Sequence, residues 1–299
     1  MKKLKFIIIL ASIVYATMAN AQKPIKVFED SILIGANHFP GLTVTIPEVD
    51  YEKTLKNWIK EQESGTKSRV VTGNGEMTIF GAIKKEVTSD PLNIYSKLAN
   101  QDTLQKLTVC FELKKDEYIE PSAGDIAMTS AKTYLKEFAK SQYIDFIKGE
   151  VQAEEKKLRE LNNELGSLLK NESRTKRGAQ SDKNTIRDEQ DKLLVKNNEL
   201  NLLSTEIINQ NNLLISMEAG PGRDAKTAQI KELEKRKNKL QKGINRSENS
   251  IGKAKTSINQ ADRALPKNEN QQGKMRERIE EQEAVVQKFI DKLNAVKAY

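Results

Sequence analysis

Apolar residues recur at heptad spacing through the last part of the chain, and this pattern restricts the possible folds more than any other feature. Between residues 230 and 296, two series of positions repeat every seven residues, and fifteen of their twenty members are apolar. The first series is Ile230, Lys237, Ile244, Ile251, Ile258, Leu265, Gln272, Ile279, Val286 and Leu293, and the second is Leu233, Leu240, Ser247, Ala254, Ala261, Asn268, Met275, Gln282, Phe289 and Val296. Such a repeat, with charged residues elsewhere, is typical of a coiled-coil helix.

An earlier stretch supplies a partner for this helix. It keeps the same seven-residue step at Ile186, Leu193, Leu200, Ile207 and Leu214. Between the two stretches, Gly220 and Pro221 end one helix and Asp224 is a candidate N-cap of the next. We therefore predict an antiparallel coiled-coil hairpin over residues 126–299 with its apex near 220–222. Residues whose numbers add to about 441, such as Leu200 and Leu240, are expected to face each other.

Each predicted arm contains a polar interruption. These lie near residues 170–185 and 266–273, at overlapping distances from the apex. We interpret them as a weak point that both arms share. Pro266 lacks the amide hydrogen of a continuous helix, so a kink is expected there.

The first 21 residues resemble a secretory signal peptide. Lys2, Lys3 and Lys5 precede an apolar or small run over residues 6–14, and Ala19-Asn20-Ala21 offers a small-x-small cleavage site. The run is shorter than the roughly 20 residues that span a bilayer, and no later transmembrane segment is predicted. We expect cleavage before Gln22 and a periplasmic or secreted protein. Cys110 is the only cysteine, which excludes an internal disulfide.

Residues 22–125 predict a small α/β head. Alternating apolar residues indicate strands near 42–46, 69–72, 77–83, 94–99 and 104–113. A helix capped by Asp50 follows the first strand and another starts near Ser122; residues 25–34 are a further candidate strand. The fold class is α+β, with a strand-helix-four strands-helix head on an antiparallel sheet, followed by the hairpin. This order is similar to that of TATA-binding-protein-like and helix-grip folds. A groove between sheet and helix is a candidate site for a small ligand.

Positive charge is concentrated on the returning arm. Residues 22–149 contain 17 basic and 18 acidic residues, whereas residues 223–255 contain 11 basic and 4 acidic ones. Complementary flanks of paired helices are one explanation, because residues 181–218 carry a net charge of −3. The alternative is a basic surface for an acidic partner. The candidate docking residues are Lys231, Lys235, Arg236, Lys239, Lys242 and Arg246.

No residue pattern predicts catalysis, a metal or a cofactor. His38 is the only histidine, and Gly73-x-Gly75 lies between two strands, as in a hairpin turn, rather than before a helix, as in a phosphate loop. We predict a non-enzymatic envelope protein that uses its hairpin to dock an acidic protein partner or anionic envelope surface; nucleic acid is disfavoured, and oligomerisation stays open.

Two alternatives remain. One is a periplasmic holdase, since the Skp/OmpH chaperones are similar in plan, and the other is small-ligand binding by the head. We expect the outer hairpin surface to be polar, which favours docking over holding unfolded chains.

Overall fold

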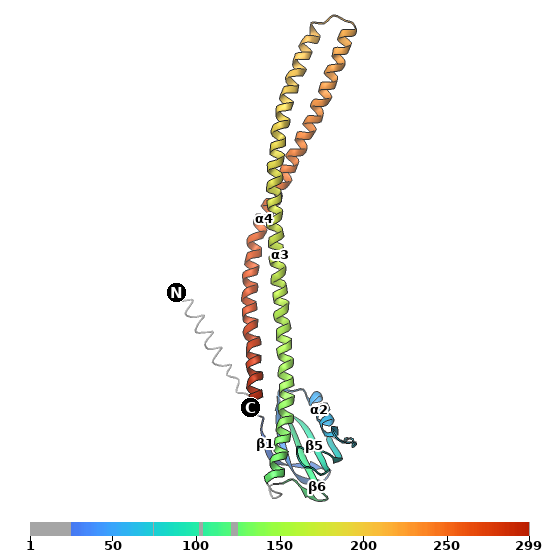
Figure 1. Cartoon of the computed structure of the whole chain (residues 1–299), viewed down its shortest axis with the longest axis vertical. Helices are drawn as coiled ribbons and strands as arrows, with labels where there is room; N and C mark the ends of the chain where they lie inside the picture. The colour runs from blue at the N-terminus through green and yellow to red at the C-terminus, as the bar shows by residue number, and fades with distance from the viewer. Residues whose placement is uncertain (1–24, 74, 102–103, 121–124, 299) are drawn as a thin grey trace, which may run out of the picture. The chain divides into compact units, whose positions relative to one another are not determined.

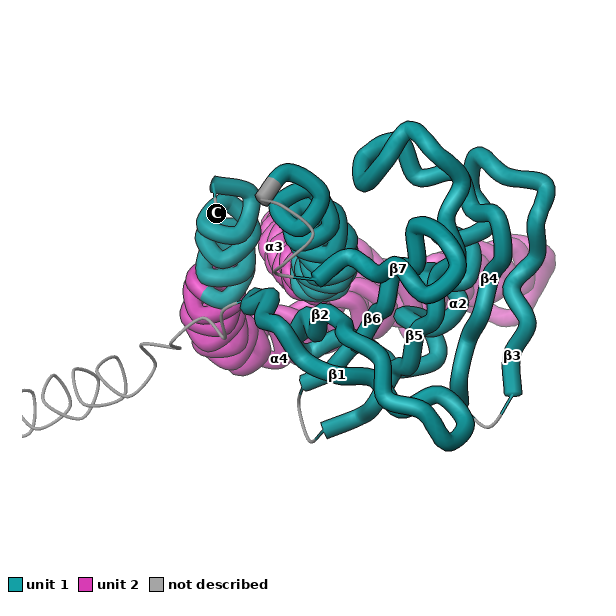
Figure 2. Tube along the Cα trace, turned by 90° about the horizontal axis from the view of Figure 1, so that it is seen from below, with its two compact units in different colours: residues 1–155, 285–299 teal, residues 156–284 magenta. Residues whose placement is uncertain are grey.

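The structure is a computed structural model that describes residues 25–73, 75–101, 104–120 and 125–298. The predicted signal peptide, the Asn74 turn position and the predicted helix start near Ser122 lie outside these ranges. The chain divides into two compact units (Figure 2). The sheet unit comprises residues 1–155 and 285–299, and the hairpin unit comprises residues 156–284. The overall class is α+β.

An antiparallel seven-stranded sheet forms the centre of the sheet unit. The strand order is β1-β2-β6-β5-β4-β3, with β7 also paired to β6. The strands are β1 (Val27–Ile34), β2 (Asn37–Pro47), β3 (Val71–Gly73), β4 (Glu76–Ala82), β5 (Leu92–Gln101), β6 (Leu104–Lys114) and β7 (Glu117–Tyr118). The predicted strands are present, including the candidate at 25–34. The short strand expected at 69–72 begins two residues later.

Helix α2 (Tyr51–Glu63) forms where the sequence predicts it. The side chain of Asp50 accepts a hydrogen bond from the backbone N of Lys53 at 2.9 Å and so caps the helix. Trp58 on its apolar face is fully buried, and Tyr51, Leu55 and Ile59 pack beside it. This face and the first turns of α3 (Asp125–Ile215) supply helical side chains to the core.

The core of the sheet unit combines the inner sides of the strands with three helices. Leu107, Val109 and Phe111 of β6 are buried in it, as alternation along a half-covered strand requires. Leu135 of α3 and Val296 of α4 (Pro221–Ala298) are fully buried in the same cluster. Residues far apart in the sequence therefore close one core.

The prediction of a separate second head helix is wrong. That helix and the outgoing arm are one continuous helix, α3, of 91 residues. The two halves of α3 bury different sets of side chains: aromatic residues together with aliphatic ones in the sheet unit, and aliphatic residues without aromatic ones in the hairpin unit. Gly149 lies between the two halves, but a single glycine is tolerated inside a helix, and no proline separates them, so the helix continues.

The opposite side of the sheet holds a buried carboxylate beside an aromatic group. Glu112 is 7% exposed and accepts hydrogen bonds from Asn93 Nδ2 at 2.8 Å, Tyr95 OH at 2.9 Å and the backbone N of Asp116 at 3.2 Å. The Phe39 ring stacks on Tyr95, with centroids 6.0 Å apart. Cys110, two residues before Glu112, is completely buried.

We predict that the Cys110 thiol is unreactive in the folded protein. Burial, together with the nearby Glu112 charge, raises the pKa of Cys110 to about 12, so the nucleophilic thiolate is scarce at neutral pH. Titration with a thiol reagent should give no fast reaction until denaturant is added. A Cys110→Ser, Lys97→Cys variant is the control, because Lys97 is exposed and its replacement should react at once. Rapid native labelling of Cys110 would contradict the burial.

The hairpin unit consists of α3 from residue 156 onwards and α4 up to residue 284, which run side by side in opposite directions (Figure 1). Every member of the two heptad series on α4 is buried or half-buried except Lys237. On α3, positions separated alternately by three and four residues, from Leu158 through Glu172 and Leu193 to Leu214, are all at least half-buried. The predicted helical hairpin is therefore confirmed.

The pairing register also agrees with the prediction. Lys196 was expected opposite position 245, and its Nζ donates to Gly243 O at 3.1 Å and to Ser247 Oγ at 2.8 Å. Near the apex, Lys226 Nζ donates to Gln210 Oε1 at 2.7 Å. Gly243 and Ser247 lie within one helical turn of the predicted position, whereas Gln210 lies five residues, about one and a half turns, from the predicted position 215.

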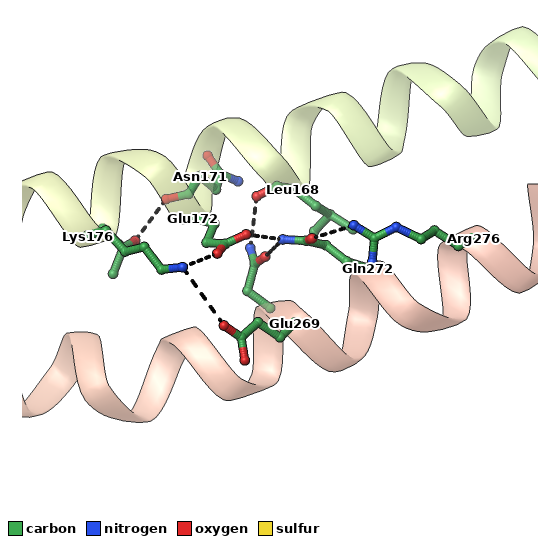
Figure 3. A network of polar contacts seen from close by, with 9 residues as sticks. Leu168, Asn171, Glu172, Lys176, Glu269, Gln272 and Arg276 are labelled. Atoms are coloured by element: carbon green, nitrogen blue, oxygen red, sulfur yellow. Dashed lines mark hydrogen bonds and ion pairs between the residues drawn. The ribbon is translucent and has the colours of Figure 1, made fainter.

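Both helices continue through the polar segments. At this level, Gln272 Nε2 donates to Glu172 Oε2 at 2.6 Å, and Asn268 Nδ2 donates to Leu168 O at 3.2 Å (Figure 3). Hydrogen bonds from Lys176 and Gln272 hold the pKa of Glu172 below its usual range. The heptad positions are thus kept but filled with polar residues. α4 also runs through Pro266, which is exposed, so solvent can bind the carbonyl that lacks a helical donor.

The apex of the hairpin differs from the prediction at the residue where α4 begins. α4 begins at Pro221, three residues before the predicted cap Asp224. The backbone N atoms of Arg223 and Asp224 both donate to Gly220 O, at 3.0 and 3.2 Å. Proline suits the first helical position because its missing hydrogen has no partner there, and Asp224 places a negative charge in the first turn.

Candidate docking surface on the helical hairpin

Five of the six predicted docking residues lie along one exposed side of α4. Lys231, Lys235, Lys239, Lys242 and Arg246 are separated by four, four, three and four residues, which keeps them on one helix face. The heptad positions that pair with α3 lie on the opposite side. We call these five residues the basic stripe; it extends roughly 22 Å at 1.5 Å per residue.

Arg236 does not belong to the stripe. It turns towards α3, where its guanidinium lies 3.8 Å from a carboxylate oxygen of Glu199. For Arg236, the positive charge is therefore explained by pairing with an acidic residue on the neighbouring helix. Lys253, which was not among the predicted residues, extends the stripe by one heptad beyond Arg246 and is also exposed. It stands seven residues after Arg246 and fourteen after Lys239, and this regular spacing was a signal that could have found it.

The stripe keeps most of its positive charge. Lys235 Nζ lies 3.1 Å from Glu232 Oε2, with both side chains two-thirds exposed, and an exposed pair of this kind contributes little. Among the described residues, no ion pair involves Lys231, Lys239, Lys242 or Arg246. Neighbouring stripe charges lie within the screening length of roughly 10 Å at 0.1 M salt, so their potentials add. The stripe can attract an extended acidic surface.

The outer side of α3 between residues 194 and 215, which we call distal α3, is less polar than expected. We predicted that the hairpin would be polar outside its seam, but six large aliphatic residues there are exposed: Leu194, Val195, Leu202, Ile208, Leu213 and Ile215. They are between 53% and 80% exposed. They lie outside the heptad series that faces α4, which was the sequence signal for them. The two arms therefore present different outer faces, one basic and one aliphatic.

The sheet unit offers a weaker candidate. A shallow open groove of about 490 Å³ lies between β1 and the start of α3, lined by Val27, Phe28 and the lysines Lys26, Lys132 and Lys136. The space between α2, α3 and the sheet is filled: the Trp58 and Phe138 ring centroids lie 4.8 Å apart there. His38 is exposed on β2.

Within the described part of the chain, no group of three or more histidine, cysteine or acidic residues is arranged to hold a metal ion. None of the helices in the described ranges is both long and apolar enough to cross a bilayer. No protein-family model matches the sequence, and no curated protein matches it either.

Proposed function

We propose that this chain is an exported, non-enzymatic envelope protein whose coiled-coil hairpin docks an acidic protein partner. The single observation that carries the proposal is the basic stripe, five exposed cations on one helix face with only one local ion pair. The signal-like residues 1–21 support export. A helix face that tracks along an acidic partner gives electrostatic steering and register more than raw affinity.

The test is capture of partners from an envelope extract at low and high salt. Reversing three stripe residues, with Lys235→Glu, Lys239→Glu and Lys242→Glu, should abolish capture because six units of charge are changed on one face. Raising the salt should weaken wild-type capture. The far-UV circular dichroism of the variant should be unchanged, since all three side chains are exposed.

The matched control reverses the same number of charges on the same helix. Arg263→Glu, Lys267→Glu and Lys274→Glu also replace exposed cations of α4, outside the stripe. This control should keep its partner. Equal losses of partner capture in both variants would show a general effect of net charge and would contradict specific binding by the basic stripe. Binding of the wild type to anionic vesicles, with no protein captured, would reassign the stripe to a membrane surface.

A holdase is the second candidate, and the exposed aliphatic residues of α3 favour it. A chaperone of this kind binds many unfolded chains through accessible apolar surface. The test is whether the protein suppresses the aggregation of several unrelated unfolded outer-membrane proteins. If it does, and if charge reversal of the basic stripe leaves this activity unchanged, the holdase becomes the first candidate.

A further inference from the structure

The two end strands of the sheet differ in how much free backbone they carry. β1 and β3 lie at opposite ends of the strand order (Figure 2). β3 has only three residues, and an edge strand this short gives another chain little to pair with. β1 has eight residues, about 26 Å of extended chain, and among the described strands it pairs with β2 alone. The other edge of β1 is therefore the one that a further strand could join.

Every second residue of β1 turns its backbone groups away from β2. Thr45 N donates to Lys26 O at 3.0 Å, so this opposed pair is hydrogen-bonded. The register that follows is uninterrupted, so the N–H and C=O groups of Val27 and Glu29 point outwards. No described residue forms a hydrogen bond with these outward groups. The next outward N–H, that of Ser31, is already bonded to the side chain of the preceding residue at 2.8 Å, so the free stretch ends there.

The shallow groove of the sheet unit lies along this free stretch. Residues 25–28 form one wall of the groove and α3 forms the other. Lys132 Nζ lies 2.7 Å from Glu29 Oε1, so α3 faces the side of β1 on which Glu29 stands. Lys26 and Phe28 alternate to the other side, where Phe28 is 40% exposed. A strand laid along β1 would thus have Lys132 and Lys136 on one side and an exposed aromatic ring on the other.

The charge of the groove selects an acidic ligand. Three lysines line it, Lys26, Lys132 and Lys136, and none of its lining residues is acidic. Glu29 stands at its end and pairs with Lys132, but both side chains are more than a third exposed, so a competing carboxylate can replace this contact at little cost. The free backbone beside the lysines favours an extended peptide over a small anion, because only a peptide can pair with both.

We propose that the free edge of β1 and the facing lysines of α3 bind an extended acidic segment of a partner protein, which joins the sheet as an added strand. Main-chain hydrogen bonds to Val27 and Glu29 would supply affinity, and alternate side chains would supply specificity. Acidic side chains on the α3 side meet Lys132 and Lys136, and apolar ones on the other side meet Phe28. This binding site belongs to the sheet unit and does not depend on the basic stripe.

Fluorescence anisotropy with a synthetic peptide tests the binding. The probe is a labelled ten-residue peptide that alternates glutamate with valine. It should bind the full chain saturably, and the same peptide with lysine in place of glutamate should not. Charge reversal of the basic stripe should leave the affinity for the probe unchanged, because the stripe lies in the other unit.

Glu29→Pro separates strand addition from simple charge attraction. Proline lacks the outward N–H and its ring occupies the free edge, while the hydrogen bonds between β1 and β2 are kept. The change also removes a negative charge, so attraction by the lysines alone would strengthen binding of the acidic peptide. We expect instead an affinity at least about tenfold lower. Glu29→Ala is the matched control: it loses the same charge, keeps the N–H, and should bind at least as tightly as the wild type.

Charge reversal tests the other wall of the groove. Lys132→Glu with Lys136→Glu should weaken binding of the peptide at least about tenfold, since acidic side chains would then face acidic ones. Lys53→Glu with Lys56→Glu reverses two exposed lysines of α2, outside the groove, and should bind as the wild type does. Urea unfolding followed by Trp58 fluorescence checks that each variant keeps its fold.

Three outcomes would overturn the proposal. The first is the absence of saturable binding of the glutamate–valine peptide at millimolar concentration. The second is equal affinity of Glu29→Pro and Glu29→Ala, which would leave charge attraction without an added strand. The third is binding of oleate in place of the peptide, lost in Lys132→Glu with Lys136→Glu and unchanged in Glu29→Pro, which would assign the groove to an anionic amphiphile.

Discussion

Replacing Trp58 with alanine is expected to destabilise the sheet unit by about 3–5 kcal/mol, as for other fully buried large aromatic side chains. The Trp58 ring is completely buried, and its centroid lies 4.8 Å from that of Phe138 and 6.1 Å from that of Tyr134. Its Nε1 donates to Ser96 Oγ at 2.9 Å. The change therefore leaves a cavity between α2, α3 and the sheet and removes a buried hydrogen bond.

Hydrogen exchange measures this loss where circular dichroism would not, because α3 and α4 dominate the helical signal. Amides of β5 and β6 that open only with the core should exchange roughly 100- to 3,000-fold faster in Trp58→Ala, since each 1.4 kcal/mol is a factor of ten. Trp58→Phe is the control: it keeps most of the ring contacts, and Ser96 retains its hydrogen bond from Gln62 Nε2 at 2.7 Å. Trp58→Phe should lose less than half as much free energy of unfolding as Trp58→Ala. Unchanged exchange in Trp58→Ala would mean that this packing does not stabilise the sheet.

Replacing Glu112 with glutamine is expected to cost roughly 2 kcal/mol at pH 7, the range of hydrogen bonds to a charged group. Burial alone would raise the pKa of Glu112, but hydrogen bonds from Asn93, Tyr95 and the backbone of Asp116 outweigh burial and hold its pKa below the usual value. Glutamine has one acceptor oxygen in place of two, so at least one of these donors loses its partner.

The pH dependence identifies the charge as the cause. A carboxylate with a lowered folded-state pKa stabilises the fold above its unfolded pKa, near 4.3, and loses that contribution as the pH falls through the folded value. The difference between wild type and Glu112→Gln should therefore shrink as the pH falls below the unfolded pKa and through the lower folded pKa. Urea unfolding of the sheet unit can be followed by the fluorescence of the single tryptophan, Trp58, which lies in the core on the other side of the sheet. Glu117→Gln, at an exposed site on β7, should have little effect at any of these pH values. A constant difference across the range would exclude the charge as the source of stability.

The basic stripe and the aliphatic face show how far the sequence could predict the candidate sites. Lys231, Lys235, Lys239, Lys242 and Arg246 could be placed together because their spacing alone puts them on one helix face. Arg236 is adjacent in sequence but faces Glu199, which depends on how the partner helix is positioned. The exposed Leu202 and Ile208 were missed, although their positions outside the heptad series that faces α4 were a signal that α4 does not cover them.

The sequence by itself determined the hairpin. A seven-residue repeat fixes which side of each helix is buried, and Gly220-Pro221 fixes where the chain reverses, so the register of Lys196 against Gly243 and Ser247 follows from counting. It also determined the strands and the cap of α2 by Asp50, because alternation and capping are local properties.

Only the tertiary structure decided the interactions between distant residues. Nothing local predicts that Lys84 is buried and donates to the carbonyl oxygens of Glu61 and Ser64, satisfying the end of α2. Nor does the sequence near Val296 predict that it closes a core built around residues 25–147. These contacts depend on where the folded chain brings separate segments, and a charged side chain is buried only where such a segment offers it partners.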